Sequence, residues 1–153
     1  MKPLYIFDID GTLADCSHRV HMLDSEDDDK WLRFYDACDG DSPIMAVIET
    51  LNRLSRVCDV WFFTGRTESV RSKTVEWLEC NTRFSILDFK NPILTMRPDG
   101  DYTPDWKLKE LWLKSMLDID RNRLIGVFDD RNSVVDMWRR NCVTCFQVAD
   151  GDF

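Results

Sequence analysis

The sequence lacks any hydrophobic segment long enough to cross a membrane, since no stretch approaches 18 consecutive apolar residues. It also lacks a leader-like N-terminus and starts directly with an apolar run typical of a strand, so we expect a cytoplasmic protein. Several of the six cysteines lie inside apolar runs, as reduced, buried cysteines do. No internal repeat or low-complexity tract occurs. With 153 residues, 44% of them hydrophobic, the chain is expected to form one globular domain.

Positive charge is also scarce, and the imbalance is uneven. The chain has 20 Lys and Arg against 28 Asp and Glu, a net charge of −8. Residues 24–41 alone hold eight acidic residues against Lys30 and Arg33, a net of −6. This balance argues against broad affinity for nucleic acids, which depends on Lys and Arg contacts to phosphates. It leaves room for a few arginines directed at a single phosphate.

Short apolar runs alternate with stretches of helical periodicity, which predicts an α/β fold with a mostly parallel sheet. We expect strands near residues 3–9, 57–63, 93–96, 124–128 and 143–148. We expect helices over residues 43–56, 68–80, 103–117 and 132–141. Residues 14–42 fit neither pattern, so we expect a small helical insertion over the C-terminal end of the first strand. The whole chain, residues 1–153, is then one domain.

The most informative stretch ends the first strand, where an apolar run leads into Asp8-Ile9-Asp10-Gly11-Thr12. In a strand, side chains at i and i+2 point to the same side. Two buried carboxylates repel each other unless a cation or a proton lies between them. The pattern therefore indicates Mg²⁺-dependent phosphoryl chemistry, and the alternative is a strand that ends in an ordinary Asp-Gly turn.

Polar residues also follow the other expected strands, at the sheet edge where open α/β proteins bind ligands. They are Thr64, Gly65 and Arg66 after the second strand, Arg97 after the third, and Asp129 and Asp130 after the fourth. Asp105 and Lys109 are spaced i and i+4, so they would share one helix face. We expect the fold to bring these groups together.

These motifs occur in the order D-x-D-G-T, T-G-R, lysine and D-D, and in this the chain resembles the haloacid dehalogenase (HAD) superfamily of phosphatases. Residues 129–140 and 147–153 further resemble the 3′-phosphatase domain of bacteriophage polynucleotide kinase–phosphatase, a likeness that covers nearly the whole chain. The kinase P-loop pattern G-x-x-x-x-G-K-[ST] does not occur. The resemblance implies a Rossmannoid three-layer sandwich with a small helical cap, and removal of 3′-phosphates from polynucleotide ends.

The resemblance also implies roles for single residues. Asp8 would be the nucleophile that forms an aspartyl-phosphate, and Asp10 would donate and accept protons. Thr64, next to the supporting Gly65, would hydrogen-bond the phosphoryl group. Lys109, held by Asp105, would neutralise charge, and Lys107 is a rival for this role. The expected Mg²⁺ ligands are Asp8, the backbone carbonyl of Asp10, Asp129 and Asp130.

Three arginines match positions that clamp the substrate in the polynucleotide phosphatase: Arg19, Arg66 and Arg97. The planar guanidinium group suits this role because it grips two phosphate oxygens at once. The alternative is that the arginines form surface salt bridges with the acidic segment.

The substrate stays open between several candidates. An acidic segment beside the site should repel a polynucleotide within a Debye length of about 8 Å. This favours, as an alternative, a nucleotidase or a phosphatase for another small phosphoester. A second alternative is a non-catalytic phosphate-binding subunit beside a separate kinase or ligase. No residue can be assigned to a 2′-hydroxyl group, so DNA and RNA are not distinguished.

Overall fold

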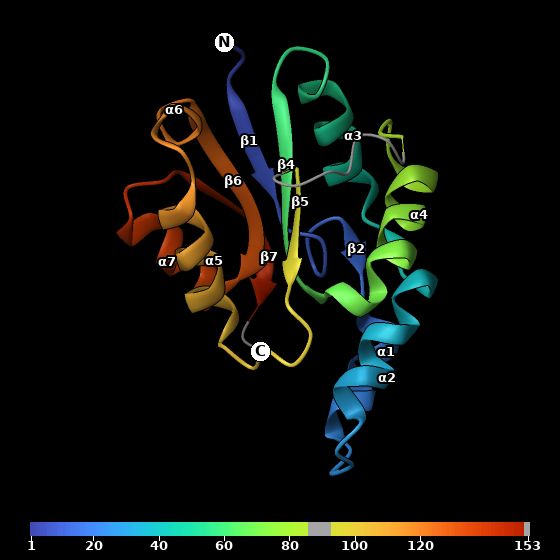
Figure 1. Cartoon of the computed structure of the whole chain (residues 1–153). Helices are drawn as coiled ribbons and strands as arrows, with labels where there is room; N and C mark the ends of the chain where they lie inside the picture. Colours follow the sequence, from blue (N-terminus) through green and yellow to red (C-terminus); the bar gives the residue numbers. More distant parts are fainter. Residues whose placement is uncertain (86–92, 152–153) are drawn as a thin grey trace.

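The computed structural model describes residues 1–85 and 93–151. Its central sheet has five parallel strands in the order β5-β4-β1-β6-β7 (Figure 1). The strands are β1 Leu4–Phe7, β4 Asp59–Thr67, β5 Leu94–Arg97, β6 Leu124–Arg131 and β7 Cys145–Gly151. This topology confirms the predicted α/β fold with a parallel sheet.

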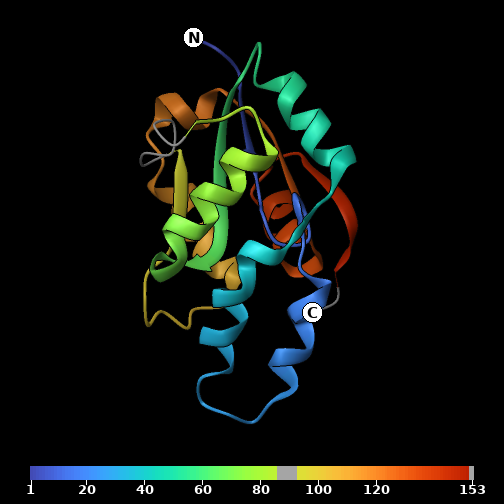
Figure 2. The ribbon, with the colours of Figure 1, turned by 90° about the vertical axis from the view of Figure 1, so that its right-hand side faces the viewer.

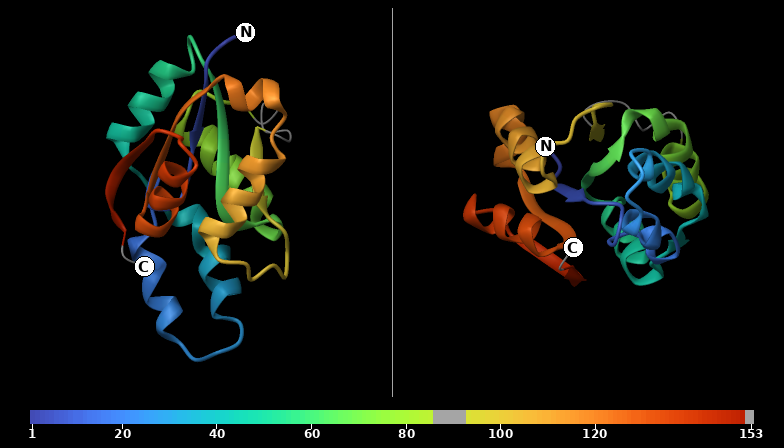
Figure 3. Two further views of the ribbon diagram at one scale, coloured as in Figure 1. Left: turned by 90° about the vertical axis from the view of Figure 1, so that its left-hand side faces the viewer. Right: turned by 90° about the horizontal axis from the view of Figure 1, so that it is seen from below.

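Helices cover both faces of the sheet and give three layers, as Figures 1 and 3 show. On one face lie α3 Met45–Leu54, the 3₁₀ turn η3 Glu68–Val70 and α4 Arg71–Asn81. On the other lie α5 Asp105–Ser115, α6 Asp118–Asn122 and α7 Asn132–Arg140.

The strand β4 shows why both faces need cover. Its apolar side chains alternate between the two cores: Val60 and Phe62 pack with the α3 and α4 side, while Trp61 and Phe63 pack with the α5 and α7 side. All four side chains are buried. A strand buried on both faces reads as an unbroken apolar run, as the sequence does here.

The segment between the first strand and α3 forms a helical projection on a small stem. The stem pairs β2 Ala14–Asp15 with β3 Ser42–Pro43 in antiparallel fashion. Between them lie α1 Ser17–Val20, η1 His21–Asp24, α2 Lys30–Asp36 and η2 Ala37–Gly40. Figures 1 and 2 show this projection extending past the C-terminal ends of the strands, with the turn before α2 at its far tip.

Element boundaries differ from expectation mainly at the ends of three strands. Strands β4, β6 and β7 run on past their expected ends, because backbone pairing continues where the apolar pattern stops. The register shifts between Thr64 and Thr67, and again between Asp129 and Arg131. Such irregularities bend a strand and re-aim its side chains. The stem and α6 were not anticipated.

Asp152 and Phe153, which belong to the closing stretch of the resemblance, lie outside the described residues. Within the described part of the chain, no helix combines the length and the apolar character that a membrane span requires.

Candidate active site

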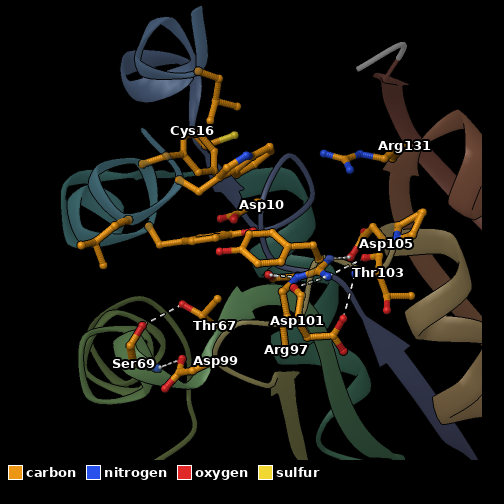
Figure 4. A pocket seen from close by; sticks show the side chains of 18 of the residues that line it. Asp10, Cys16, Thr67, Ser69, Arg97, Asp99, Asp101, Thr103, Asp105 and Arg131 are labelled. Atoms are coloured by element: carbon orange, nitrogen blue, oxygen red, sulfur yellow. Dashed lines mark hydrogen bonds and ion pairs between the residues drawn. The ribbon is translucent and has the colours of Figure 1, made fainter. Parts of the chain in front are cut away.

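The C-terminal ends of the strands border a pocket of about 660 Å³. Six of the residues predicted for the site line it: Asp8, Asp10, Gly65, Arg97, Asp105 and Asp130. The other five are buried behind the pocket wall: Arg19, Thr64, Arg66, Lys109 and Asp129. Figure 4 shows Cys16 on one side of the pocket, and Arg131, Thr103 and Asp105 on the other. The fold thus gathers all the predicted residues in and around one cavity.

Three carboxylates contact one buried amine and a fourth lies beside two of them, and we call this group the lysine network: Lys109 with Asp8, Asp105 and Asp129, and Asp130. The Lys109 Nζ lies 2.9 Å from Asp8 Oδ1, 2.9 Å from Asp129 Oδ2 and 3.2 Å from Asp105 Oδ2. The Lys109 side chain is fully buried, whereas the rival, Lys107, is exposed. The structure therefore places Lys109 beside the expected nucleophile.

The lysine network holds more negative than positive charge. Burial raises the pKa of Asp8 well above its usual value; Asp129 adds to this effect, and Lys109 opposes it. Burial and the charge of Asp129 together raise the pKa of Asp130 to about 6. Burial alone would lower the pKa of Lys109, but the surrounding carboxylates hold it well above its usual value. Even with the Arg97 guanidinium group 3.4 Å from Asp105, the four carboxylates outnumber these two cationic groups, so the site favours a further cation.

Three of these side chains could hold that cation together. One carboxylate oxygen each from Asp8, Asp129 and Asp130 lies within 4.8 Å of the others. A set of oxygen ligands beside a phosphate site suits Mg²⁺, a hard cation that completes its shell with water. The donor set therefore fits the predicted metal. The Asp10 carboxylate lies outside this cluster of side chains, so its predicted contribution through the backbone carbonyl stays a prediction.

A second group, the arginine network, consists of Arg19, Arg66, Asp10 and Asp41. Asp10 Oδ1 accepts from Arg19 Nη2 at 2.7 Å and from Arg66 Nη2 and Nε at 2.6 and 2.9 Å. Asp41 Oδ2 accepts from both arginines at 2.7 Å, and its Oδ1 accepts from Arg19 Nε at 2.7 Å. Two carboxylates therefore face two guanidinium groups, and the charges balance.

The two guanidinium groups determine the protonation state of Asp10. Burial works against ionisation, but the charges of Arg66 and Arg19 outweigh it, so the pKa of Asp10 lies below its usual value. All three arginine hydrogen bonds go to Oδ1, which fixes the carboxylate, and Asp10 is one of the residues that line the pocket. The two arginines thus hold Asp10 as a carboxylate through its Oδ1 atom.

Two of the arginines predicted to bind substrate, Arg19 and Arg66, are engaged by carboxylates of the protein itself. The Arg19 and Arg66 side chains are fully buried, and carboxylates occupy their guanidinium groups. Their substrate-binding role stays a prediction, and the geometry favours holding Asp10 in place. The expected alternative, ion pairing with the acidic segment, occurs through Asp41, although inside the protein rather than on its surface.

Arg97 lines the pocket but is also engaged with the backbone. Its guanidinium group donates to the carbonyl oxygens of Gly65, Asp101 and Thr103, and lies 3.4 Å from Asp105 Oδ1. It therefore fixes the loop that follows β5. A clamp role for Arg97 also stays a prediction.

Two glycines allow the carboxylates to approach the backbone. Gly11 has a φ of +79°, and a Cβ there would lie 2.1 Å from Asp130 Oδ2. A Cβ on Gly65 would lie 2.7 Å from Asp105 Oδ1. A side chain at either position would displace a carboxylate of the lysine network, which gives Gly65 its supporting role.

Two hydroxyl groups complete the surroundings of the carboxylates. The Thr12 hydroxyl donates to Asp130 Oδ1 at 3.3 Å, and the Thr64 hydroxyl accepts from the backbone N–H of Arg66 at 3.2 Å. The Thr64 hydroxyl keeps its proton for another acceptor. Its predicted hydrogen bond to a phosphoryl group stays a prediction.

Sequence reasoning missed two features of the site. Asp41, one of eight acids in its segment, is a buried partner of both arginines, and nothing in the local pattern distinguishes it. The second feature is an apolar pocket wall that includes Trp31, Phe34 and Tyr35. Their i, i+3, i+4 spacing inside a polar segment is a helical signal that could have revealed it.

The fold and the site together define a haloacid-dehalogenase-like α/β protein. The fold matches that of the haloacid dehalogenase-like family protein SP0104 from Streptococcus pneumoniae with a TM-score of 0.59 at 14% identity, covering 95% of this chain and 84% of that one. It also matches the class C acid phosphatase from Bacillus anthracis with a TM-score of 0.60 at 17% identity, covering 87% and 53%.

The family follows from the sequence match. The chain belongs to the family of polynucleotide kinase PNKP phosphatase domains, whose model matches residues 2–153, and it is therefore a HAD phosphatase domain. It is 30% identical, with a TM-score of 0.73, to a chain of the Pnkp1/Rnl/Hen1 RNA repair complex. That match covers 99% of this chain but only 44% of the relative. A second structure of the Pnkp1/Rnl/Hen1 complex matches at 31% identity, a TM-score of 0.72, and 99% and 48% coverage.

Proposed function

We propose that this protein is a Mg²⁺-dependent phosphatase that removes 3′-phosphates from polynucleotide ends through an aspartyl-phosphate on Asp8. The observation that carries the proposal is that Asp8 and Asp10 line one pocket and that each is held by its own cationic side chains. Asp8 lies 2.9 Å from Lys109, and Asp10 is fixed by two arginines. The family and its relatives in an RNA repair complex support a nucleic-acid substrate.

In the first step, an oxygen of Asp8 attacks phosphorus while the bond between phosphorus and the leaving 3′ oxygen breaks. Lys109 stabilises the negative charge that gathers on Asp8 and the phosphoryl oxygens. The leaving oxygen takes a proton from Asp10 Oδ2. A nearby phosphate raises the pKa of a carboxyl group, which allows Asp10 to carry that proton once substrate is bound.

In the second step, water attacks the phosphorus of the aspartyl-phosphate, Asp10 takes the proton of this water, and Asp8 and inorganic phosphate are released. The lowered pKa of Asp10 in the free site suits its return to the carboxylate form. The Thr64 hydroxyl would donate to a phosphoryl oxygen. Asp8, Asp129 and Asp130 would hold Mg²⁺, which when bound neutralises the repulsion between carboxylate and phosphate.

We further propose that residues 14–42 serve as a small cap that leaves the pocket mouth open to a bulky substrate. The acidic residues of this segment do not oppose a polynucleotide as strongly as their number suggests. Arg33 pairs with Asp27 at 2.7 Å and with Asp29 at 3.3 Å, and Lys73 pairs with Asp36 at 2.7 Å. Residues 24–29 are not among those that line the pocket.

The test is phosphate release with Mg²⁺ from a 3′-phosphorylated oligonucleotide and from a 3′-mononucleotide, with EDTA as control. We expect faster release from the oligonucleotide, no release in EDTA and none from Asp8→Asn, whose fold should be intact by circular dichroism. Preference for the mononucleotide would make the enzyme a nucleotidase. Release by Asp8→Asn at the parent rate would refute the mechanism.

The two relatives from the Pnkp1/Rnl/Hen1 complexes also support a proposal about the protein partners of this domain. Chains that this protein resembles occur in assemblies of Pnkp1, Rnl and Hen1. We propose that this domain acts beside a separate kinase or a separate ligase. The ligase would rejoin the ends that this domain has dephosphorylated. Size-exclusion chromatography of the protein purified from its source would show such a partner as a co-eluting ligase activity.

A further inference from the structure

The pocket has two walls of opposite character. The wall at the strand ends carries the carboxylates Asp8, Asp10 and Asp130. The wall formed by the helical projection is apolar, and its side chains are Val20, Leu23, Trp31, Leu32, Phe34 and Tyr35. Trp31 is 42% exposed, and Leu32 is 61% exposed, although both lie in a chain with an ample core. One cavity therefore offers a phosphate site beside an open aromatic surface.

The aromatic surface is held rigidly from behind. The Trp31 and Tyr35 rings stack with centroids 6.0 Å apart, and Trp31 meets Phe34 edge-on at 6.0 Å. The Arg19 guanidinium group lies over the Phe34 ring at 4.1 Å and donates to the Phe34 carbonyl at 3.1 Å. Arg19 also binds Asp10, so the rings are fixed relative to the reacting groups.

A fixed loop lies across the pocket from these rings. Tyr102 is 85% exposed and lines the pocket between two anchored neighbours. The carbonyls of Asp101 and Thr103 both accept from Arg97, and Asp99 accepts from the backbone N–H of Ser69 (Figure 4). Tyr102 is thus a further aromatic residue of the pocket lining, and it lies on a loop of defined position.

We propose that this pocket binds the terminal nucleobase of the substrate, with Trp31 as its main stacking partner and Tyr102 on the opposite side. The inference rests on the proposed function and narrows its substrate class. A phosphate placed at Asp8 leaves its ester group in the pocket, beside the aromatic wall. Flat bases stack on aromatic rings regardless of sequence. A sugar phosphate would instead bury hydroxyl groups against apolar side chains, which is costly.

The experiment compares two oligonucleotides that differ only in their last residue. Both carry a 3′-phosphate, but one ends in a normal nucleotide and the other in an abasic residue. We expect the parent to prefer the base-bearing end in kcat/KM, and Trp31→Ala to reduce that preference about tenfold. Trp31→Phe should restore most of it. Leu111→Ala, which truncates an exposed apolar side chain outside the pocket wall, is the matched control and should leave the preference unchanged.

Other outcomes separate this inference from the proposed function. If the parent shows no preference for a base, or if Trp31→Ala leaves the preference intact, the nucleobase site is refuted while the phosphatase stands. If the parent releases phosphate from neither oligonucleotide, the proposed function fails. Calorimetric titration of Asp8→Asn with adenosine 3′-monophosphate and with inorganic phosphate then decides the inference. Tighter binding of the nucleotide that Trp31→Ala weakens about tenfold would sustain it, and equal affinities would overturn it.

Discussion

The two ion-pair networks beside the pocket differ in their balance of charge. In the lysine network the carboxylates outnumber the cationic groups that contact them, and the pKa values of Asp8, Asp129 and Asp130 are raised. In the arginine network two carboxylates meet two guanidinium groups, and the pKa of Asp10 is lowered. The first network is left with excess negative charge, which fits the proposed binding of a divalent cation. The second is complete as folded and serves to position Asp10.

The most severe test of this difference between the two networks is to remove the ammonium group of Lys109. We expect Lys109→Met to lower the rate of phosphate release about 100- to 1,000-fold, because the charge that stabilises the transition state is lost. Lys107→Met is the matched control, since this exposed lysine is two residues away and contacts no carboxylate of the site. Steady-state kinetics would check both variants. Equal losses in the two would remove Lys109 from the mechanism.

In the arginine network, the expected effect is on stability. Asp41→Asn leaves two buried guanidinium groups with one charged partner, so we expect the free energy of unfolding to fall by about 3–5 kcal/mol. Urea denaturation measures this, with the exposed Asp39→Asn as the control. A cost for Asp41→Asn no larger than that for Asp39→Asn would mean that the network does not hold the fold together.

The pH dependence of stability should distinguish the networks through the sign of their pKa shifts. Raised carboxyl pKa values in the lysine network mean that, without metal, the folded state binds more protons than the unfolded state between about pH 4 and 6. In EDTA, stability should therefore fall as pH rises through this window, by about 1–2 kcal/mol. Asp10 acts in the opposite direction, because its contribution is lost as pH falls through its lowered pKa.

Thermal denaturation in EDTA and in Mg²⁺ at pH 5 and pH 7 checks this prediction. Mg²⁺ should stabilise the protein at pH 7 and flatten the slope, and Asp130→Asn should flatten it without metal. An identical slope under both conditions would show that these carboxylates do not bind the cation.

The smallest effect is expected at the tip of the projection, where ion pairs face solvent. Arg33 pairs with Asp27 and Asp29, and all three side chains are about half exposed. We expect Arg33→Ala to leave the free energy of unfolding nearly unchanged, because exposed pairs are screened by solvent and salt. Urea denaturation at two salt concentrations measures it. A loss approaching that of Asp41→Asn would erase the distinction between buried and exposed pairs.

Much of the fold and the membership of the site could be predicted from the sequence, for a physical reason. A parallel sheet collects whatever follows its strands at one edge, so Asp8, Thr64 and Asp129 could be placed together from order alone. The lysine could be chosen because Asp105 and Lys109 share a helix face. The roles of these residues stay predictions until they are measured.

The rest depended on how residues 14–42 fold back, which no local pattern reveals. Asp41 lies 22 residues after Arg19 and 25 before Arg66, and only the β2–β3 stem brings it to both. For the same reason, the sequence did not reveal that Arg19 and Arg66, which are predicted to bind substrate, are buried ion-pair partners. The strand tips of β4 and β6 escaped prediction because backbone pairing leaves no trace in the side-chain pattern.

The stem that joins the projection to the sheet has a consequence for how such enzymes can diversify. The groups that tie the projection to the chemistry lie near its base, in Arg19, Asp41 and the β2–β3 pairing, and Arg19 also holds Phe34 of the outer part. The outer part, from Val20 to Asp36, carries the aromatic wall and the acidic turn. A grafted tip from another family member could therefore alter what the pocket accepts while the reacting groups stay in register. The projection is in this sense an exchangeable module, both for evolution and for protein engineering.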